Sequence, residues 1–503
     1  MPNHLPLQTT FCPVLPTIVG NVDYQRFEVQ LKRINEILLL GGVEDLFVQL
    51  SLDHWQSQHS DCHLSASQQL SFQEASSRAL RCMILKGLLR EDYRGLSRRL
   101  AECPLFQWFT GSAALDQVRV PSKSTLHRYL SWMPKDKLDL VVVHLIKAAA
   151  QQPEEDVDHA LGLTHQIELD NLWMDGTCLK ANIHYPVDWL LLRDATRTLM
   201  KATILIRNHG LKHRMQAPEV FLSQMNRLCI QMTQGNRFEP ETKKHRKAVL
   251  RQVKKLSQLI GRHAARHRKL LEKHWQETDW QQGHVNQVLE RIQGVLDLLP
   301  KAIKQAHERI IGERPINNKD KILSLYEGDV QVIVRGKAST DVEFGNTLLI
   351  AEQAQGLVVD WKLYKDTAPS DSRQLPESMD RVEERFGIGC VEALGGDRGF
   401  DSAKNRKLLA SKEIFNGLCP KSIQDHKRRK HSGRFKMIQR RRAQIEGRIA
   451  ILKNDFLGSP CRSKGFENRD QMVTWSVLTH NLWVLARLEK KNQPIEDADS
   501  IAA

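Results

Sequence analysis

The sequence predicts an α/β fold: a mixed β-sheet flanked by helices, preceded by a helical region and interrupted by a long all-helical insertion after its first strand. Three observations predict it. Apolar residues recur at helical spacing over 71–135 and again over about 206–320. Strand-like apolar segments occur before Asp175 and recur from about residue 323 to Cys419. A basic helix around Glu446 follows the last of these segments.

Composition indicates a globular protein with an anionic partner. The chain has 503 residues, of which 41% are hydrophobic and 26% charged, and its formal net charge is +15. A cationic excess of this size favours nucleic acid over a membrane surface. The nine cysteines include no Cys-x-x-Cys pair, and no apolar run reaches transmembrane length. We therefore expect a soluble, cytoplasmic protein with reduced cysteines and no zinc site.

Changes in composition suggest how the chain divides into domains. A polar, acidic stretch at 151–156 has the character of a linker. We expect, in order, an N-terminal helical segment at 1–70, a helical DNA-binding domain at 71–150, the first part of the sheet domain at 160–205, the helical insertion at 206–320, the rest of the sheet domain with a C-terminal helix at 321–490, and a tail at 491–503.

The helices of 71–150 end in a short polar, basic helix. Pro121 and Ser122 are typical of a helix start. Lys123 and Arg128 would lie on the exposed face of this helix, with Leu126 on the buried face. The arrangement is similar to a helix-turn-helix, whose second helix enters the major groove of DNA. The alternative is a small helical bundle with a charged face.

Two acidic residues are expected near strand ends. Asp175 follows an apolar strand and precedes a glycine, so it is either a metal ligand presented by the sheet or part of an Asp-Gly turn. Asp397 follows two glycines, which allow close approach of a ligand, and Arg398 beside it suits a phosphate. Asp401 is instead expected to be the N-cap of the next helix.

The insertion is predicted to form long antiparallel helices. His263 and His267 stand four residues apart, but no acidic or cysteine partner accompanies them, so a metal site is not favoured there. A basic helix face is usually only solvated, but one this dense could follow a DNA backbone. The face contains Lys243, Lys244, Arg246, Lys247, Arg251, Lys254, Lys255, Arg262, Arg266, Arg268 and Lys269.

A third acidic residue lies on a predicted helix at 442–453. Arg442, Glu446 and Lys453 share one helix face, because they are separated by four and seven positions. This pattern is either a surface ion pair or a metal-binding carboxylate between cations that bind phosphate oxygens. A predicted basic loop just upstream carries Lys427, Arg428, Arg429 and Lys430.

These segments resemble the DDE transposases of bacterial insertion sequences, which share the RNase H-like fold with retroviral integrases. Met174-Asp-Gly-Thr177 is similar to the strand of the first acid, and Gly396-Asp-Arg-Gly-Phe-Asp-Ser402 to the segment of the second. Around the third, the chain matches three positions of a Tyr/Arg/Glu/Lys signature, with Gln439 at the Tyr position. The resemblance covers roughly 165–200 and 320–485.

The resemblance implies a reaction and its partners. Asp175, Asp397 and Glu446 would form the catalytic triad and hold two Mg²⁺ ions, with Mn²⁺ as a substitute. The ions would support DNA cleavage followed by strand transfer. The partners would be double-stranded DNA, both transposon terminal inverted repeats and target DNA, bound by a homodimer or larger assembly in a bacterial cytoplasm. Cations near these acids and on the short N-terminal helix would contact this DNA. They are Arg398, Arg442, Lys453, Lys427, Arg428, Arg429, Lys430, Lys123 and Arg128.

Two alternatives remain open. A metal-dependent DNA nuclease of the same fold would use the same three acids but cut without joining. A DNA-binding regulator with an inactive core would use only the helical region and the basic insertion.

Overall fold

The structure is a computed structural model that describes residues 15–60, 63–113, 117–151, 160–234, 239–337 and 340–490. The chain divides into two compact units. The expected linker at 151–156 lies outside the described residues except for Gln151, and the expected tail at 491–503 lies outside them entirely. The first unit comprises Met1–Leu179, Thr347–Tyr364 and Ala368–Ala503, and the second comprises Lys180–Asn346 and Lys365–Thr367.

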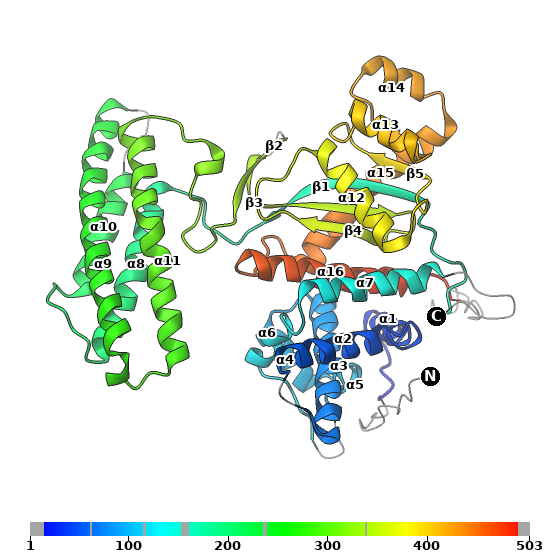
Figure 1. Ribbon diagram of the computed structural model, residues 1–503, viewed down its shortest axis with the longest axis horizontal. Coiled ribbons are helices and arrows are strands. Elements are labelled where there is room, and N and C mark those ends of the chain that lie inside the picture. The colour runs from blue at the N-terminus through cyan, green and yellow to red at the C-terminus, as the bar shows by residue number, and fades with distance from the viewer. Residues whose placement is uncertain are drawn as a thin grey trace. The chain divides into compact units, whose positions relative to one another are not determined.

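A mixed β-sheet forms the centre of the first unit (Figure 1). β1 pairs in parallel with β5, which pairs in parallel with β6, whereas β3 and β4 form an antiparallel hairpin. The apolar segments on either side of Ala354-Gln-Gly356 predict this hairpin with glycine in its turn, and the prediction is confirmed. Gly356 has a φ of +96°, a conformation that glycine adopts readily. The strands are β1 (Asn171–Lys180), β3 (Thr340–Gln353), β4 (Val358–Leu363), β5 (Ala393–Gly396) and β6 (Phe415–Leu418).

Helices cover both faces of this sheet. Successive side chains of a strand point to opposite faces. On β4, Asp360 bonds to Arg381 of α12, whereas Trp361 bonds to Thr474 of α16. The helices packed on the sheet are α12 (Asp371–Phe386), α13 (Ala403–Ser411), α15 (Gly433–Ile451) and α16 (Phe466–Leu485). A mixed sheet with flanking helices is therefore confirmed, and it is consistent with an RNase H-like fold.

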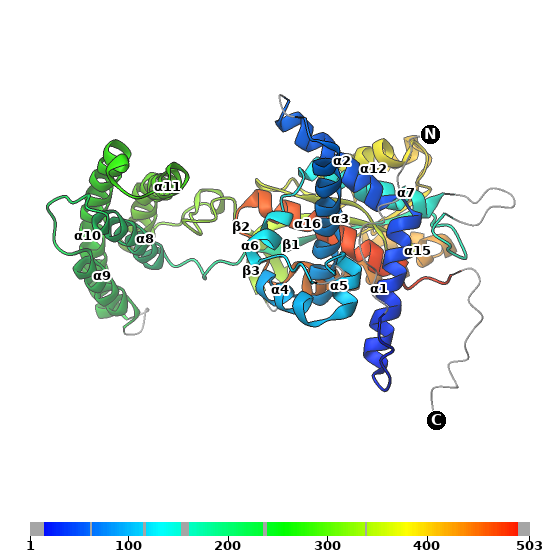
Figure 2. The same ribbon diagram turned by 90° about the horizontal axis from the view of Figure 1, so that it is seen from below.

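The N-terminal helices share one hydrophobic core with the sheet. α16, expected as a core helix, is buried along most of its length and packs against α1, α3 and α7 (Figure 2). Trp475 Nε1 donates to the carbonyl of Leu130 at 3.0 Å. The N-terminal helices are α1 (Val22–Leu40), α2 (Val43–Gln58), α3 (Ala66–Leu89), α4 (Tyr93–Glu102), α5 (Pro104–Thr110), α6 (Lys123–Tyr129) and α7 (Lys135–Ala150).

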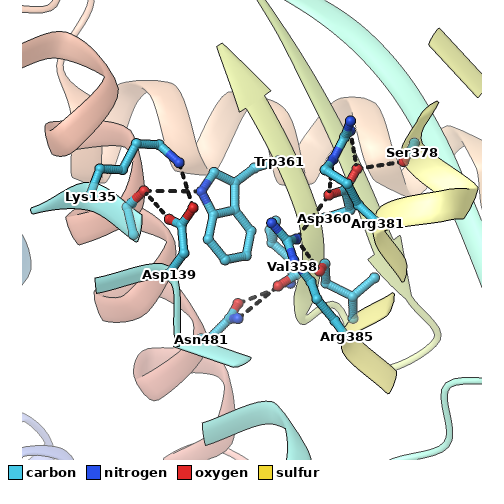
Figure 3. A network of polar contacts seen from close by, with 11 residues as sticks. Lys135, Asp139, Val358, Asp360, Trp361, Ser378, Arg381, Arg385 and Asn481 are labelled. Carbon is cyan, nitrogen blue, oxygen red and sulfur yellow. Dashed lines mark hydrogen bonds and ion pairs between the residues drawn. The ribbon is translucent and has the colours of Figure 1, made fainter. Parts of the chain in front are cut away.

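A buried polar network fixes β4 between the helices on either side of it (Figure 3). The Asp360 carboxylate is fully buried and accepts hydrogen bonds from Ser378 (2.5 Å), Arg381 (2.9 and 2.6 Å) and Arg385 (2.9 Å). The Asn481 side chain bonds both backbone polar groups of Val358 at 2.9 Å. The Asn481 side-chain amide thus makes the two hydrogen bonds that a neighbouring strand would make with Val358 at this edge of the sheet.

The second unit is mainly a bundle of four long helices. They bury a separate hydrophobic core, as the apolar spacing of the sequence predicted for helices in this region. Helix α10 is the longest, with 35 residues. The four are α8 (Asp188–Asn208), α9 (Pro218–Thr233), α10 (Pro240–His274) and α11 (Gln282–Ala306); β2 (Gln331–Lys337) pairs with the first half of β3 in the same unit.

None of the described helices combines the length and the apolar character required to cross a membrane.

Candidate active site

The pairing of β1 with β5 brings two of the predicted acids next to each other. The parallel register runs from Asn171 opposite Ala393 to Met174 opposite Gly396. The next residues along the two strands are Asp175 and Asp397. Because paired strands lie about 4.8 Å apart, these two residues are neighbours.

Backbone amides of the same segments bind the two carboxylates. Asp175 Oδ1 accepts a hydrogen bond from the Gly176 amide at 2.8 Å, and Asp397 Oδ1 accepts one from the Gly399 amide at 2.7 Å. Asp175 does not stand at a strand end, because β1 continues to Lys180. The alternative of an Asp-Gly turn is therefore wrong. Asp175 lies in the interior of β1, at the level where the neighbouring strand β5 ends.

α15 runs across the face of β1 that carries Asp175. Side chains alternate along a strand, so Trp173, Asp175 and Thr177 point to the same face. Trp173 Nε1 donates to the carbonyl of Ile438 in α15 at 2.9 Å. Lys453 Nζ lies 3.2 Å from Thr177 Oγ1. The two contacts bracket Asp175 and hold this helical segment over it.

Glu446 lies between these two contacts. It is eight residues after Ile438 and seven before Lys453, and its side chain is exposed. Helical periodicity places Arg442, Glu446 and Lys453 on one face. Lys453 belongs to a π-helical segment, Leu452–Leu457, that continues α15, and such segments are frequent at functional sites. Glu446 therefore lies on the part of the helical segment between the two contacts that bracket Asp175.

A buried ion cluster fixes α15 against β3. The Glu352 carboxylate is fully buried and contacts Arg441 at 2.7 Å and Arg448 at 3.3 Å. Burial raises the pKa of Glu352, although both guanidinium groups oppose that shift. Gly356 leaves room for Arg448, since a side chain there would collide with the guanidinium. Gln439, at the Tyr position of the signature, donates to the carbonyl of Gly417 at 2.5 Å.

The structure adds a fourth carboxylate, Asp371, that sequence reasoning missed. A methyl group built on Gly399 would collide with Asp371 Oδ2 and lie 3.0 Å from Asp397 Oδ1. One built on Gly176 would lie 3.9 Å from Asp371 Oδ1. Asp371 is in the first turn of α12, where an acid is usually explained by the helix dipole, so its sequence position alone did not reveal it.

The donor chemistry of these acids fits Mg²⁺, which prefers carboxylate oxygens. The register places Asp175 beside Asp397. The Asp371 carboxylate lies near Gly176, which follows Asp175, and near Gly399, which lies two residues after Asp397. Across the part of the chain that the structure describes, no three His, Cys, Asp or Glu side chains are arranged as a ready metal cluster. The ligand type therefore fits Mg²⁺, whereas the described residues do not bring three such side chains together as a metal cluster.

Asp401 is a structural residue, but not the predicted N-cap. Ser402 caps α13 instead, accepting from the Asn405 amide at 3.1 Å. Asp401 is fully buried and accepts two hydrogen bonds of 2.7 Å from Arg406 and one of 3.0 Å from the Lys421 amide. Although burial opposes the shift, these bonds lower the pKa of Asp401. The carboxylate thus ties the loop after Asp397 to the chain beyond β6.

The predicted phosphate-binding cations lie on three separate elements. Arg398 is exposed beside Asp397, whereas Arg442 is half-buried on α15. The prediction of a basic loop before the Glu446 helix is wrong, because most of its cations belong to a short helix, α14 (Ile423–Arg429). Of these cations, Arg428 pairs with Asp425 at 2.9 Å and Arg429 lies 3.4 Å from the Asn416 carbonyl, while Lys427 and Lys430 are exposed.

The N-terminal cations lie on α6, as predicted. Ser122 caps this helix by accepting from the Thr125 amide at 3.2 Å. Lys123 and Arg128 are exposed and Leu126 is fully buried, and α6 packs on α3 and α4. These contacts leave the basic face of α6 available to a partner.

Residues 346–482 match the family model described as the transposase DDE domain. The match includes Asp397 and Glu446, together with the Asp371 segment, while Asp175 precedes it. No curated protein and no solved structure matches the chain significantly.

Proposed function

The chain carries a transposase DDE domain, and we propose that it binds the ends of an insertion sequence and catalyses Mg²⁺-dependent cleavage and strand transfer of those ends. We base this chiefly on the register that sets Asp175 of β1 beside Asp397 of the matched domain. The two acids are 222 positions apart in the chain (397 − 175 = 222) and are neighbours at the level where β5 ends and β1 continues.

Asp175, Asp397 and Glu446 would hold the metal ions, with Asp371 as a further carboxylate at the same place. Bound Mg²⁺ would lower the pKa of an attacking water and stabilise the departing 3′ oxygen of the DNA strand. Asp175 and Asp397 come from the rigid sheet, whereas Glu446 comes from a helix fixed by the Glu352 cluster. The sheet and helix would thus hold the acids in a constant relation to the scissile phosphate.

Cations around the acids would position the DNA backbone. Arg398 directly follows one acid and is exposed. Arg442 and Lys453 flank Glu446 on one helix face, and the Lys453 ammonium already contacts β1 at Thr177. Charge-assisted hydrogen bonds from such groups to phosphate oxygens fix a strand without reading its sequence. We assign the same backbone contact to the exposed cations of α14.

Recognition of the transposon ends would involve α6. Its exposed Lys123 and Arg128 lie on a capped helix that packs on α3 and α4, and this helix would act as the second helix of a helix-turn-helix. Since transposition joins two ends to one target, we propose that at least two copies of the chain assemble on double-stranded DNA.

An assay with end-containing DNA tests this function. The full chain, incubated with Mg²⁺ and duplex carrying the DNA that flanks its reading frame, should cut at the element's ends. A duplex with a pre-cut 3′-OH end should then be joined to target DNA. Cutting without joining would identify a nuclease of the same fold, and binding without either reaction would identify a regulator.

Substitution of Asp371 tests the fourth carboxylate. We expect Asp371→Asn to weaken Mn²⁺ binding by about 10–100-fold, the loss typical for removing a group that supports a metal site. Binding is measured from the free Mn²⁺ signal in an electron paramagnetic resonance titration, so the readout does not depend on cleavage.

Asp380→Asn provides the matched control, because this acid lies exposed on the same helix α12. It should leave Mn²⁺ affinity unchanged. Equal affinity of Asp371→Asn and wild type would exclude Asp371 from the site.

A further inference from the structure

Six exposed cations of α10 form a straight line along the helix. Their separations are seven, four, seven, four and three residues, which at 3.6 residues per turn keeps all of them within a narrow strip. The strip spans 25 residues, or about 38 Å at 1.5 Å per residue. We call it the α10 stripe; it consists of Lys244, Arg251, Lys255, Arg262, Arg266 and Lys269.

The stripe lies opposite the face of α10 that packs into the bundle. Val253, Ile260, Ala264 and Leu271 are fully buried in the core of the second unit. The apolar face of the helix is therefore already covered. The stripe cannot act as part of a membrane-inserting amphipathic helix, which needs that face against lipid.

The charge of the stripe is not balanced by nearby acids. Two other α10 cations pair with acids: Lys247 with Glu313 at 2.6 Å, and Arg268 with Glu272 at 3.1 Å. Over the described ranges of the chain, the six stripe side chains form no ion pair or hydrogen bond with another side chain. Six uncompensated positive charges in one line cost self-repulsion that an anionic partner would relieve.

We propose that the α10 stripe binds the phosphate backbone of duplex DNA without reading its sequence. Duplex DNA presents one negative charge per about 1.7 Å of its axis, so a rigid row of cations about 38 Å long can neutralise several phosphates at once. The helix α10 lies between β1 and β2 in the chain, and none of the three proposed catalytic acids belongs to the unit that carries it, so its DNA contact would be additional to that at the acids. The proposal rests on the proposed function only for the identity of the partner.

Removing three stripe charges tests this surface. The variant is Lys255→Gln, Arg262→Gln and Arg266→Gln in the full chain, and fluorescence anisotropy follows its binding to a 30-base-pair duplex of arbitrary sequence in EDTA. Each phosphate contact contributes about 0.9 to the slope of log Kobs against log salt concentration. We therefore expect the slope to decrease in magnitude by about 2–3 and affinity to fall at least about 10-fold near 0.1 M salt.

A control with the same loss of charge uses the neighbouring helix. Arg291→Gln, Lys301→Gln and Lys304→Gln remove three exposed cations from α11, and the slope should change by less than about 1. Equal losses in both variants, or none in the stripe variant, would overturn the proposal. So would a stripe variant that binds duplex normally but no longer binds phosphatidylserine vesicles.

The result of this binding measurement is independent of the result of the cleavage assay. The binding measurement contains no divalent metal, so inactive carboxylates do not affect it. All three substituted side chains are exposed, so circular dichroism and the melting temperature should match those of wild type.

Discussion

Asp397→Asn and Glu446→Gln should each lower Mg²⁺-dependent cleavage of end-containing DNA by roughly 10³-fold or more, while leaving DNA binding within about twofold. The substituted amides keep the shape of the side chains but remove the charge that holds a divalent cation. Binding persists because the cations on α6, α14 and α10 remain. Cleavage is measured by gel assay with Mg²⁺ in excess, and binding by mobility shift in EDTA.

Glu392→Gln is a suitable control for these variants. Glu392 is exposed and precedes β5 at the end of the strand opposite Asp397, so it tests loss of a carboxylate from the same strand. Its cleavage rate should equal that of wild type. Near-normal cleavage by Asp397→Asn, or an equal loss in the control, would contradict the assignment of the acids.

Asp360→Asn should have the largest effect on stability, about 3–5 kcal/mol in the free energy of unfolding. Asp360 is fully buried and faces two arginines, Arg381 and Arg385 (Figure 3). Removing its charge leaves both largely buried guanidinium groups without the carboxylate that they contact. Urea denaturation followed by tryptophan fluorescence measures the change, since Trp361 adjoins the substituted residue.

Asp53→Asn shows what an exposed acid contributes. Asp53 accepts one hydrogen bond from Gln49 at 2.9 Å on the surface of α2, and its substitution should change stability by less than about 0.5 kcal/mol. A shift in the urea midpoint of the same size for both variants would show that the buried network does not stabilise β4.

Sequence alone could propose the three acids because the signals are local. The strand before Asp175, the glycines before Asp397 and the helical face of Glu446 each lie within one short segment. The hairpin turn at Gly356 and the cap at Ser122 were predictable for the same reason, since turn and cap chemistry depends on adjacent residues.

What the sequence could not provide depends on contacts between distant segments. The register that sets Asp175 beside Asp397, and the approach of Asp371 to Gly399, arise from tertiary packing. Local reasoning also ended β1 too early. It placed Asp175 at the end of the strand and left an Asp-Gly turn open as one reading, whereas β1 continues beside β3 to Lys180.

Mn²⁺ binding by the full chain on its DNA, followed by electron paramagnetic resonance, tests most directly whether the sheet acids and the helix acid share one metal site. Asp175→Asn, Asp397→Asn and Glu446→Gln should each lose bound Mn²⁺ relative to wild type, because all three carboxylates contact the same ions. Wild-type stoichiometry and affinity in Glu446→Gln would place that helix outside the site and contradict the triad.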